Sequence, residues 1–114
     1  MLRQQIRNYY GDPLGTGVVG DQSYYVREAS SVAAAGTHWL DRLAHKHRWH
    51  HSVSKMKAIV LDVDDTTLAT WNYEVFSNWA YNPTTNGQFV TDQKFPAVPG
   101  MVDMVNRAAK EGYT

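Results

Sequence analysis

The chain has 114 residues, of which 43% are hydrophobic and 19% are charged, so its composition is that of a soluble globular protein with room for one small domain. Eleven lysines and arginines balance eleven aspartates and glutamates, and a neutral chain gives no electrostatic reason to expect nucleic acid or an anionic membrane as a partner. The absence of cysteine from the sequence excludes disulfides and thiolate metal sites.

Residues 1–23 are polar and rich in glycine, so we expect loop there with at most one short helix. Residues 1–8 lack the apolar core of a secretory signal. The longest nearly apolar run, residues 58–61, is far too short to span a bilayer. We therefore expect a soluble chain that does not enter a membrane.

Residues 24–44 are predicted to form a helix that packs on the core and carries no chemistry. Apolar or small residues recur there at spacings of four and three, which is the pattern of one helix face. These residues are Tyr25, Ala29, Val32, Gly36, Trp39 and Leu43.

Residues 45–54 are basic and rich in histidine. Histidines gathered this closely could bind a transition metal, which makes a small metal-binding module one interpretation of this segment. Lys46 and Arg48 would repel a cation, however, and no carboxylate lies nearby in the sequence. A solvated connector is therefore the favoured interpretation.

Residues 57–61 form a continuous β-favouring run that ends in four apolar residues. A run without polar alternation is typical of a strand that is buried on both faces, as in the centre of a parallel sheet. Aspartates and threonines occupy most of the next positions, residues 62–67, and residues 68–95 are rich in aromatic side chains and asparagine.

A second helix is predicted to begin after Pro99 and Gly100. Asp103 lies in its first turn and Lys110 in its last, and Gly112 suits the position just beyond its end. Residues 113–114 would begin another strand. The order of strand, insertion, helix and strand makes up most of one βαβ unit, so the sequence predicts an α/β fold.

Asp62 and Asp64 come directly after the predicted strand, where ligands bind in parallel α/β sheets. Strand geometry would point both carboxylates to one side, and a divalent cation such as Mg²⁺ would relieve their repulsion. One carboxylate can attack a phosphate ester as nucleophile, while a second protonates the leaving oxygen and later activates water. Asp62 fits the first role and Asp64 the second. Thr66 can bond the turn backbone or a phosphoryl oxygen, whereas Asp65 alone would be a turn or helix-capping residue.

The segment KAIVLDVDDTTL resembles the first motif of the haloacid dehalogenase-like superfamily, an apolar strand that ends in Asp-x-Asp-x-Thr. Residues 71–74 and 95–100 resemble the acid phosphatase branch, which includes bacterial acid phosphatases and plant vegetative storage proteins. The resemblance implies a Rossmann-like parallel sheet with flanking helices, with Asp62 as nucleophile and Asp64 as general acid and base. It also implies Mg²⁺ held by the Asp62 carboxylate and the Asp64 backbone carbonyl, and a small phosphorylated substrate.

On this resemblance, residues 1–54 are an N-terminal loop and helix leading into the core. Residues 55–114 are the first part of the phosphatase core, with a small cap inserted at about 67–96. The chain would then hold an N-terminal helix, the first strand, the cap and a second helix. Aromatic residues of the cap would either wall the substrate entrance or pack the cap onto the core. They are Trp71, Tyr73, Phe76, Trp79 and Tyr81.

The family also needs a Ser or Thr after its second strand, a Lys and a late acidic pair, none of which the sequence reaches before Thr114. Lys94 and Lys110 do not suit the lysine role, because both precede that second strand. We therefore expect an N-terminal fragment of a phosphatase, with an inactive storage or binding relative, or a truncated non-functional chain, as the alternatives. Relatives in this branch are often exported, whereas the sequence itself indicates neither compartment nor oligomeric state.

Overall fold

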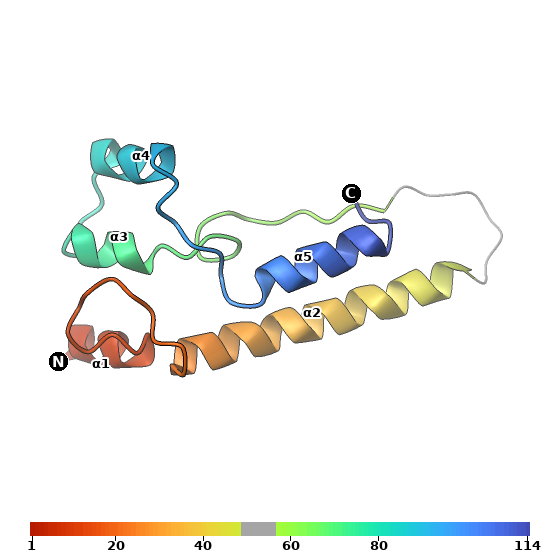
Figure 1. The fold of residues 1–114 in the computed structure, drawn as a ribbon, viewed down its shortest axis with the longest axis horizontal. Coiled ribbons are helices and arrows are strands. Elements are labelled where there is room, and N and C mark those ends of the chain that lie inside the picture. Colours follow the sequence, from red (N-terminus) through yellow and green to blue (C-terminus); the bar gives the residue numbers. More distant parts are fainter. Residues whose placement is uncertain (49–56) are drawn as a thin grey trace.

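The computed structural model describes residues 1–48 and 57–114, and its regular elements within these ranges are helices. The molecule measures 56 × 30 × 18 Å and has a radius of gyration of 17.5 Å. A closed domain of this length would have a radius of gyration of about 13 Å, so the chain is markedly elongated (Figure 1). The helices are α1 (Leu2–Tyr9), α2 (Tyr24–Arg48), α3 (Trp71–Phe76), α4 (Pro83–Thr91) and α5 (Met101–Lys110).

The two helices predicted from periodicity are confirmed, and they pack side by side in the same direction (Figure 1). Gly36 on α2 brings the backbone close to α5, because a Cβ there would lie 3.0 Å from the Sδ of Met104. Further along the pair, the Nε of Arg107 donates to the Oδ1 of Asp41 at 2.9 Å. The predicted stripe is only partly the packed face, because Val32 and Trp39 are 68% and 54% exposed. The next residues along the chain, Ala33 and Leu40, are buried instead.

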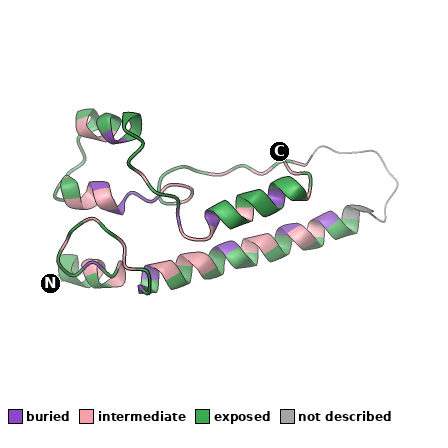
Figure 2. Cartoon of the chain, in the orientation of Figure 1, coloured by how far each residue is buried: buried purple, intermediate pink, exposed green. Residues whose placement is uncertain are grey.

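A small buried cluster joins this helix pair to the segment between α2 and α5. It consists of Ala33, Ala69, Val98 and Met101. Figure 2 shows that buried residues on α2 and α5 are interspersed with exposed ones, and that α4 is exposed over most of its surface. The core is thus narrow, which agrees with the elongated shape.

The predicted Rossmann-like parallel sheet is wrong, because within the described residues the backbone pairs only as isolated bridges. Lys57 and Tyr113 form one parallel bridge, and its neighbouring hydrogen bonds run from Thr114 N to Lys57 O at 2.8 Å and from Ile59 N to Thr114 O at 3.0 Å. A central strand needs a partner along each edge, whereas residues 57–59 have this one short contact. The side chain of Val60 is consequently exposed, at 96% relative accessibility, rather than buried.

The positions of the predicted helices agree with the structure except at the end of α2. The short helix allowed for residues 1–23 is α1. Helix α2 continues through His45 to Arg48, so the expected connector begins inside a helix. Residues 49–56 lie outside the described residues, and with them most of the proposed histidine-rich metal module. Gly112 has φ = 84°, the left-handed conformation expected just beyond the end of α5.

Gly100→Ala is expected to lower the free energy of unfolding by about 2–4 kcal/mol, because a strained backbone angle and a steric overlap add. Gly100 has φ = 85°, and a Cβ there would lie 2.7 Å from the Cβ of Ala33 on α2. Urea melts followed by tryptophan fluorescence measure the loss. Gly112→Ala is the matched control, since Gly112 has the same backbone angle to within 1° and no atom within 4 Å of an added Cβ. Equal losses in the two variants would contradict the contribution from packing.

Candidate active site

The acidic segment that follows the bridge at Lys57 folds into a tight loop. The amides of Thr67 and Leu68 both donate to the carbonyl of Val63, at 3.0 and 2.9 Å, and Asp65 N donates to Leu68 O at 2.8 Å. Asp65 accordingly adopts φ = 56°, a left-handed angle that aspartate tolerates better than most residues. The loop reverses the chain directly after Asp62 and Asp64.

A second segment fixes this loop from the side. Ala69 N donates to Pro96 O at 2.7 Å, and Val98 N donates to Thr67 O at 2.9 Å. Leu68 and Ala97 form an antiparallel bridge between these two bonds. The chain after α4 therefore holds the acidic loop to the start of α5.

Asp62 is exposed, and two threonines of the loop contact it. The Oγ1 of Thr66 donates to the Asp62 Oδ2 at 3.3 Å, and the Oγ1 of Thr67 donates to the Asp62 carbonyl at 2.6 Å. The structure thus brings together Asp62 and Thr66, two of the predicted site residues. The second oxygen of the Asp62 carboxylate accepts no hydrogen bond from the described residues.

Asp64 is also exposed, and its side chain makes no hydrogen bond within the described ranges. Asp65 behaves differently, because its carboxylate accepts hydrogen bonds from the amide of Thr70 at 2.8 Å and from the Thr70 hydroxyl at 2.9 Å. This contact ties the loop to the residue that precedes α3. Asp65 is thus the structural member of the acidic segment, while Asp62 and Asp64 remain accessible.

The Asp65 carboxylate also lies close to two tyrosines of the N-terminal region. Burial, with the Asp65 charge as the next contribution, raises the pKa of Tyr10 to about 12. The same two causes raise the pKa of Tyr25. Both phenols therefore stay protonated at neutral pH and add no negative charge beside the acidic loop.

Asp12 is a buried carboxylate that the sequence analysis did not single out. Its side chain accepts hydrogen bonds from Thr16 N at 2.8 Å, Gly17 N at 2.8 Å and Trp71 Nε1 at 3.0 Å. The Thr16 hydroxyl donates a fourth bond at 2.9 Å. Burial opposes ionisation of Asp12, but these hydrogen bonds outweigh it and hold the pKa of the carboxyl below its ordinary value. An aspartate followed closely by threonine and glycine is the local signal that could have indicated this turn.

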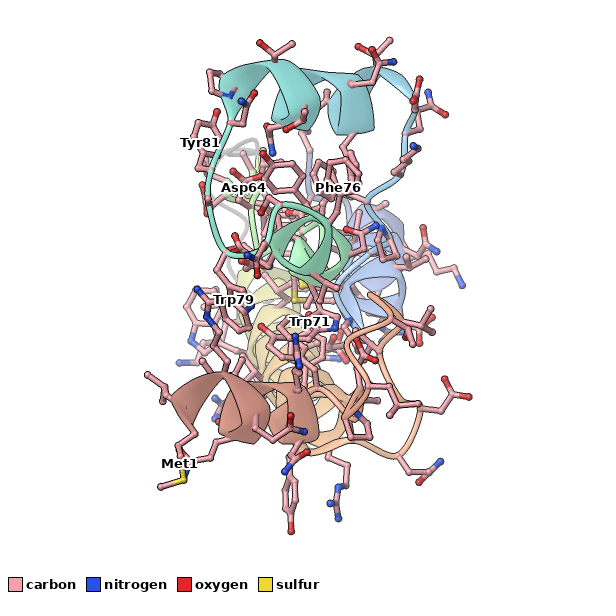
Figure 3. All side chains as sticks on the ribbon, turned by 90° about the vertical axis from the view of Figure 1, so that its left-hand side faces the viewer. Met1, Asp64, Trp71, Phe76, Trp79 and Tyr81 are labelled. Carbon is pink, nitrogen blue, oxygen red and sulfur yellow. The ribbon has the colours of Figure 1, made fainter. Side chains whose placement is uncertain are left out.

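Trp71, the first residue of α3, is the side chain that links Asp12 to the insertion. Its ring stacks on Tyr10 with centroids 4.2 Å apart, and it is 3% exposed. Figure 3 shows Trp71 between α3 and the N-terminal helix, on the opposite side of α3 from Tyr81. The N-terminal loop is therefore attached to the residue that follows the acidic loop and its Thr70 anchor.

Most of the aromatic residues of the insertion pack against one another. Tyr73 is 2% exposed, contacts Phe89 with ring centroids 5.2 Å apart, and its hydroxyl accepts from Asn82 N at 2.9 Å. Phe76 and Tyr81 are largely exposed. Trp71 therefore packs the insertion onto the rest of the chain, whereas Tyr73 packs within the insertion. The role of Phe76 and Tyr81 as a substrate wall remains a prediction.

The donors that could hold Mg²⁺ are the Asp62 carboxylate and the Asp64 backbone carbonyl, the pair that the sequence resemblance implies. Oxygen ligands suit this cation, which binds through one or two carboxylates and keeps several waters. These two oxygen donors therefore fit Mg²⁺ in kind. No group of three or more histidine or acidic side chains that could hold a metal occurs among residues 1–48 and 57–114.

The family model for the HAD superfamily, subfamily IIIB (acid phosphatase) matches residues 4–114. The chain belongs to this family. Comparison with curated proteins and with solved structures finds no significant match. The resemblance seen in the sequence motif is thereby confirmed, and it extends over α1, the Asp12 loop and α2 as well as the acidic segment.

Membership of the HAD subfamily IIIB acid phosphatases supports a phosphatase activity in general terms, with a phosphorylated molecule as substrate. None of the helices that the structure describes is long and apolar enough to cross a membrane. The exposed pair Asp62 and Asp64 lies inside the matched region.

Proposed function

We propose that this HAD acid phosphatase hydrolyses small phosphomonoesters through an aspartyl-phosphate formed on Asp62, with Asp64 as general acid and base and Mg²⁺ as cofactor. The observation that carries the proposal is the state of the Asp62 carboxylate. It is exposed, one of its oxygens is oriented by the Thr66 hydroxyl at 3.3 Å, and the other is left open to attack phosphorus.

In the first step the free Asp62 oxygen bonds to phosphorus, and the bond between phosphorus and the ester oxygen breaks. Asp64 gives its proton to that oxygen, so the alcohol leaves neutral. In the second step Asp64 takes a proton from water, whose oxygen attacks phosphorus. Phosphate is released, and the Asp62 carboxylate is regenerated.

The surroundings of the two acids support this division of roles. Thr66 orients the nucleophile, and Thr67 fixes its backbone carbonyl. The Asp64 side chain is exposed and has no hydrogen-bond partner within the described residues, so substrate and water can reach its carboxyl. Mg²⁺ would be held by Asp62 and Asp64, and when bound it would neutralise charge on the phosphoryl oxygens.

Chelation is the experiment that tests the proposed function. The intact phosphatase is expected to hydrolyse p-nitrophenyl phosphate with added MgCl₂, to lose at least about tenfold in rate with EDTA, and to recover when Mg²⁺ is restored. The 114-residue chain alone is expected to be inactive if it is a fragment, so the full-length protein is the one to assay. Release of p-nitrophenol at 405 nm measures the rate, and the diester bis(p-nitrophenyl) phosphate is the control substrate that should not react. Hydrolysis that EDTA leaves unchanged would contradict the Mg²⁺ dependence, and no hydrolysis with Mg²⁺ would contradict the activity.

A binding protein without turnover is the second candidate, and one observation favours it. No lysine or arginine among the described residues forms an ion pair with Asp62 or Asp64; Lys94, for example, pairs with Asp92 at 3.6 Å. Turnover needs positive charge beside the transferring phosphoryl group, and the described residues pair no lysine or arginine with these acids, whereas Mg²⁺ alone could still hold a bound phosphate. Binding of inorganic phosphate with Mg²⁺, measured by calorimetry, together with an absence of turnover, would favour this candidate.

A further inference from the structure

A pocket of about 400 Å³ lies between the N-terminal loop, the start of α2 and the two segments that flank the insertion. Its walls are mainly aliphatic and aromatic, and neither Asp62, Asp64 nor Thr66 lines it. We propose that this pocket binds a small uncharged aromatic molecule, of about one or two rings, at a site separate from the acidic loop.

Hydrogen bonds between the segments hold the pocket in shape. Asp12 joins the loop at Gly17 to Trp71, at 2.8 and 3.0 Å. The Nδ2 of Asn72 donates to the carbonyl of Lys94 at 2.8 Å, which joins the other two walls. Because the walls are already connected, little conformational entropy would be lost when a ligand binds. Preformed pockets bind more tightly than mobile ones for this reason.

The lining selects the chemistry of the ligand. Val18, Val26 and Pro96 supply aliphatic surface, and Trp71 and Tyr25, which are 3% and 9% exposed, form a closed part of the wall. A small flat apolar molecule suits such walls, because burying its apolar area between them stabilises the complex. The volume lies in the range of small-molecule sites, which is about 300–1,000 Å³.

The charged residues of the lining argue for a neutral ligand. Asp21 and Lys94 contribute one negative and one positive group, so the pocket has no net charge that would favour an ion. The Lys94 ammonium is already placed 3.6 Å from Asp92 and 4.9 Å from the centroid of Phe89. An anionic phosphate would therefore find no free cation here, which separates this pocket from the proposed phosphate chemistry.

Titration of the chain with 2-naphthol, which carries no phosphate, tests the proposal. The fluorescence of the probe is expected to change saturably at one site, with a dissociation constant on the order of 10⁻⁴ M. Ala97→Phe should weaken binding at least about tenfold, because Ala97 is an exposed residue of the lining and a ring there would fill the space. Ala109→Phe is the matched control, since Ala109 is an exposed alanine of α5 outside the lining, and its affinity should equal that of the wild type.

A second pair of variants covers the case in which Ala97→Phe does not fold. Val18 and Val102 are 70% and 57% exposed, and only Val18 lines the pocket. Val18→Lys should weaken 2-naphthol binding at least about fivefold, whereas Val102→Lys should leave it unchanged. Asp62→Asn should also leave it unchanged, so failure of this proposal is distinguishable from failure of the proposed phosphatase activity. Absence of saturable binding up to millimolar probe, or equal affinities within both matched pairs, would overturn the proposal.

Discussion

In the intact phosphatase, Asp62→Asn is expected to lower kcat for p-nitrophenyl phosphate by a factor on the order of 10⁴ or more, because an amide cannot form the acyl-phosphate that divides the reaction into two steps. The exchange keeps the size of the side chain and the oxygen that the Thr66 hydroxyl contacts. Asp62 is exposed, so its replacement should leave the free energy of unfolding within about 0.5 kcal/mol of the wild type. Steady-state kinetics with saturating Mg²⁺ and a urea melt provide the two measurements.

Asp103→Asn is the control for this variant, because Asp103 is an exposed carboxylate in the first turn of α5 that the proposed reaction does not use. Its kcat should stay within about twofold of the wild type. Mass spectrometry after rapid acid quench should show an added phosphoryl group on the wild type and none on Asp62→Asn. Turnover by Asp62→Asn at more than about a tenth of the wild-type rate would exclude Asp62 as the nucleophile.

Helices α2 and α5 could be predicted from the sequence because the information that forms them is local, whereas α3 and α4 were not predicted as helices. The stripe of α2 repeats within each turn, and α5 has an acidic residue in its first turn and basic residues in its last. The end of α2 was placed four residues early, at position 44 instead of Arg48. Basic residues are favourable at the C-terminal end of a helix dipole, so 45–48 could have been counted as a last turn rather than as a connector.

The sheet could not be predicted correctly because strand formation depends on partners that a local pattern does not contain. Residues 58–61 have the composition of a buried strand, yet burial requires neighbours on both edges. The described residues supply 113–114 on one side of 57–59. The apolar side chain of Val60 is therefore exposed despite its strong preference for strands.

In the candidate site, too, contacts between residues close in sequence could be predicted and contacts between distant residues could not. Asp62 and Thr66 lie four positions apart, and their contact follows from the geometry of one loop. The bond between Asp12 and Trp71 joins residues 59 positions apart, so no spacing rule could have indicated it. Such a contact depends on how α1, α2 and α3 pack together, which the sequence alone does not specify.

The acidic loop and the N-terminal loop are connected through a short series of side chains. Asp65 holds Thr70, the next residue is Trp71, and Trp71 donates to Asp12. The N-terminal loop thereby supports the residues that follow the proposed nucleophile. Of the two carboxylates in this series, Asp12 is buried and Asp65 is exposed. Asp12 also accepts four hydrogen bonds, so its replacement is the most informative test.

Asp12→Asn is expected to lower the free energy of unfolding by about 2–4 kcal/mol at pH 7. Asparagine keeps one acceptor oxygen but presents an NH₂ group where the second carboxylate oxygen accepts from Gly17 N and Trp71 Nε1. At least one buried donor would then lose its acceptor and face another donor. Urea melts followed by tryptophan fluorescence measure the loss, and Asp21→Asn, an exposed aspartate of the same loop, should change stability by less than about 0.5 kcal/mol.

The free energies of unfolding of the wild type and of Asp12→Asn, measured as a function of pH, separate the effect of the Asp12 charge from that of its shape. The pKa of Asp12 in the folded chain lies below its ordinary value of 3.8, so the unfolded chain binds this proton first as pH falls. The stabilisation is therefore fully present above about pH 5 and is lost as pH falls from about 4 through the folded pKa. The stability difference between the wild type and Asp12→Asn should narrow over that interval, because a protonated Asp12 also presents a donor. A difference that stays constant from pH 6 to pH 3 would mean that the Asp12 charge does not hold the N-terminal loop to Trp71.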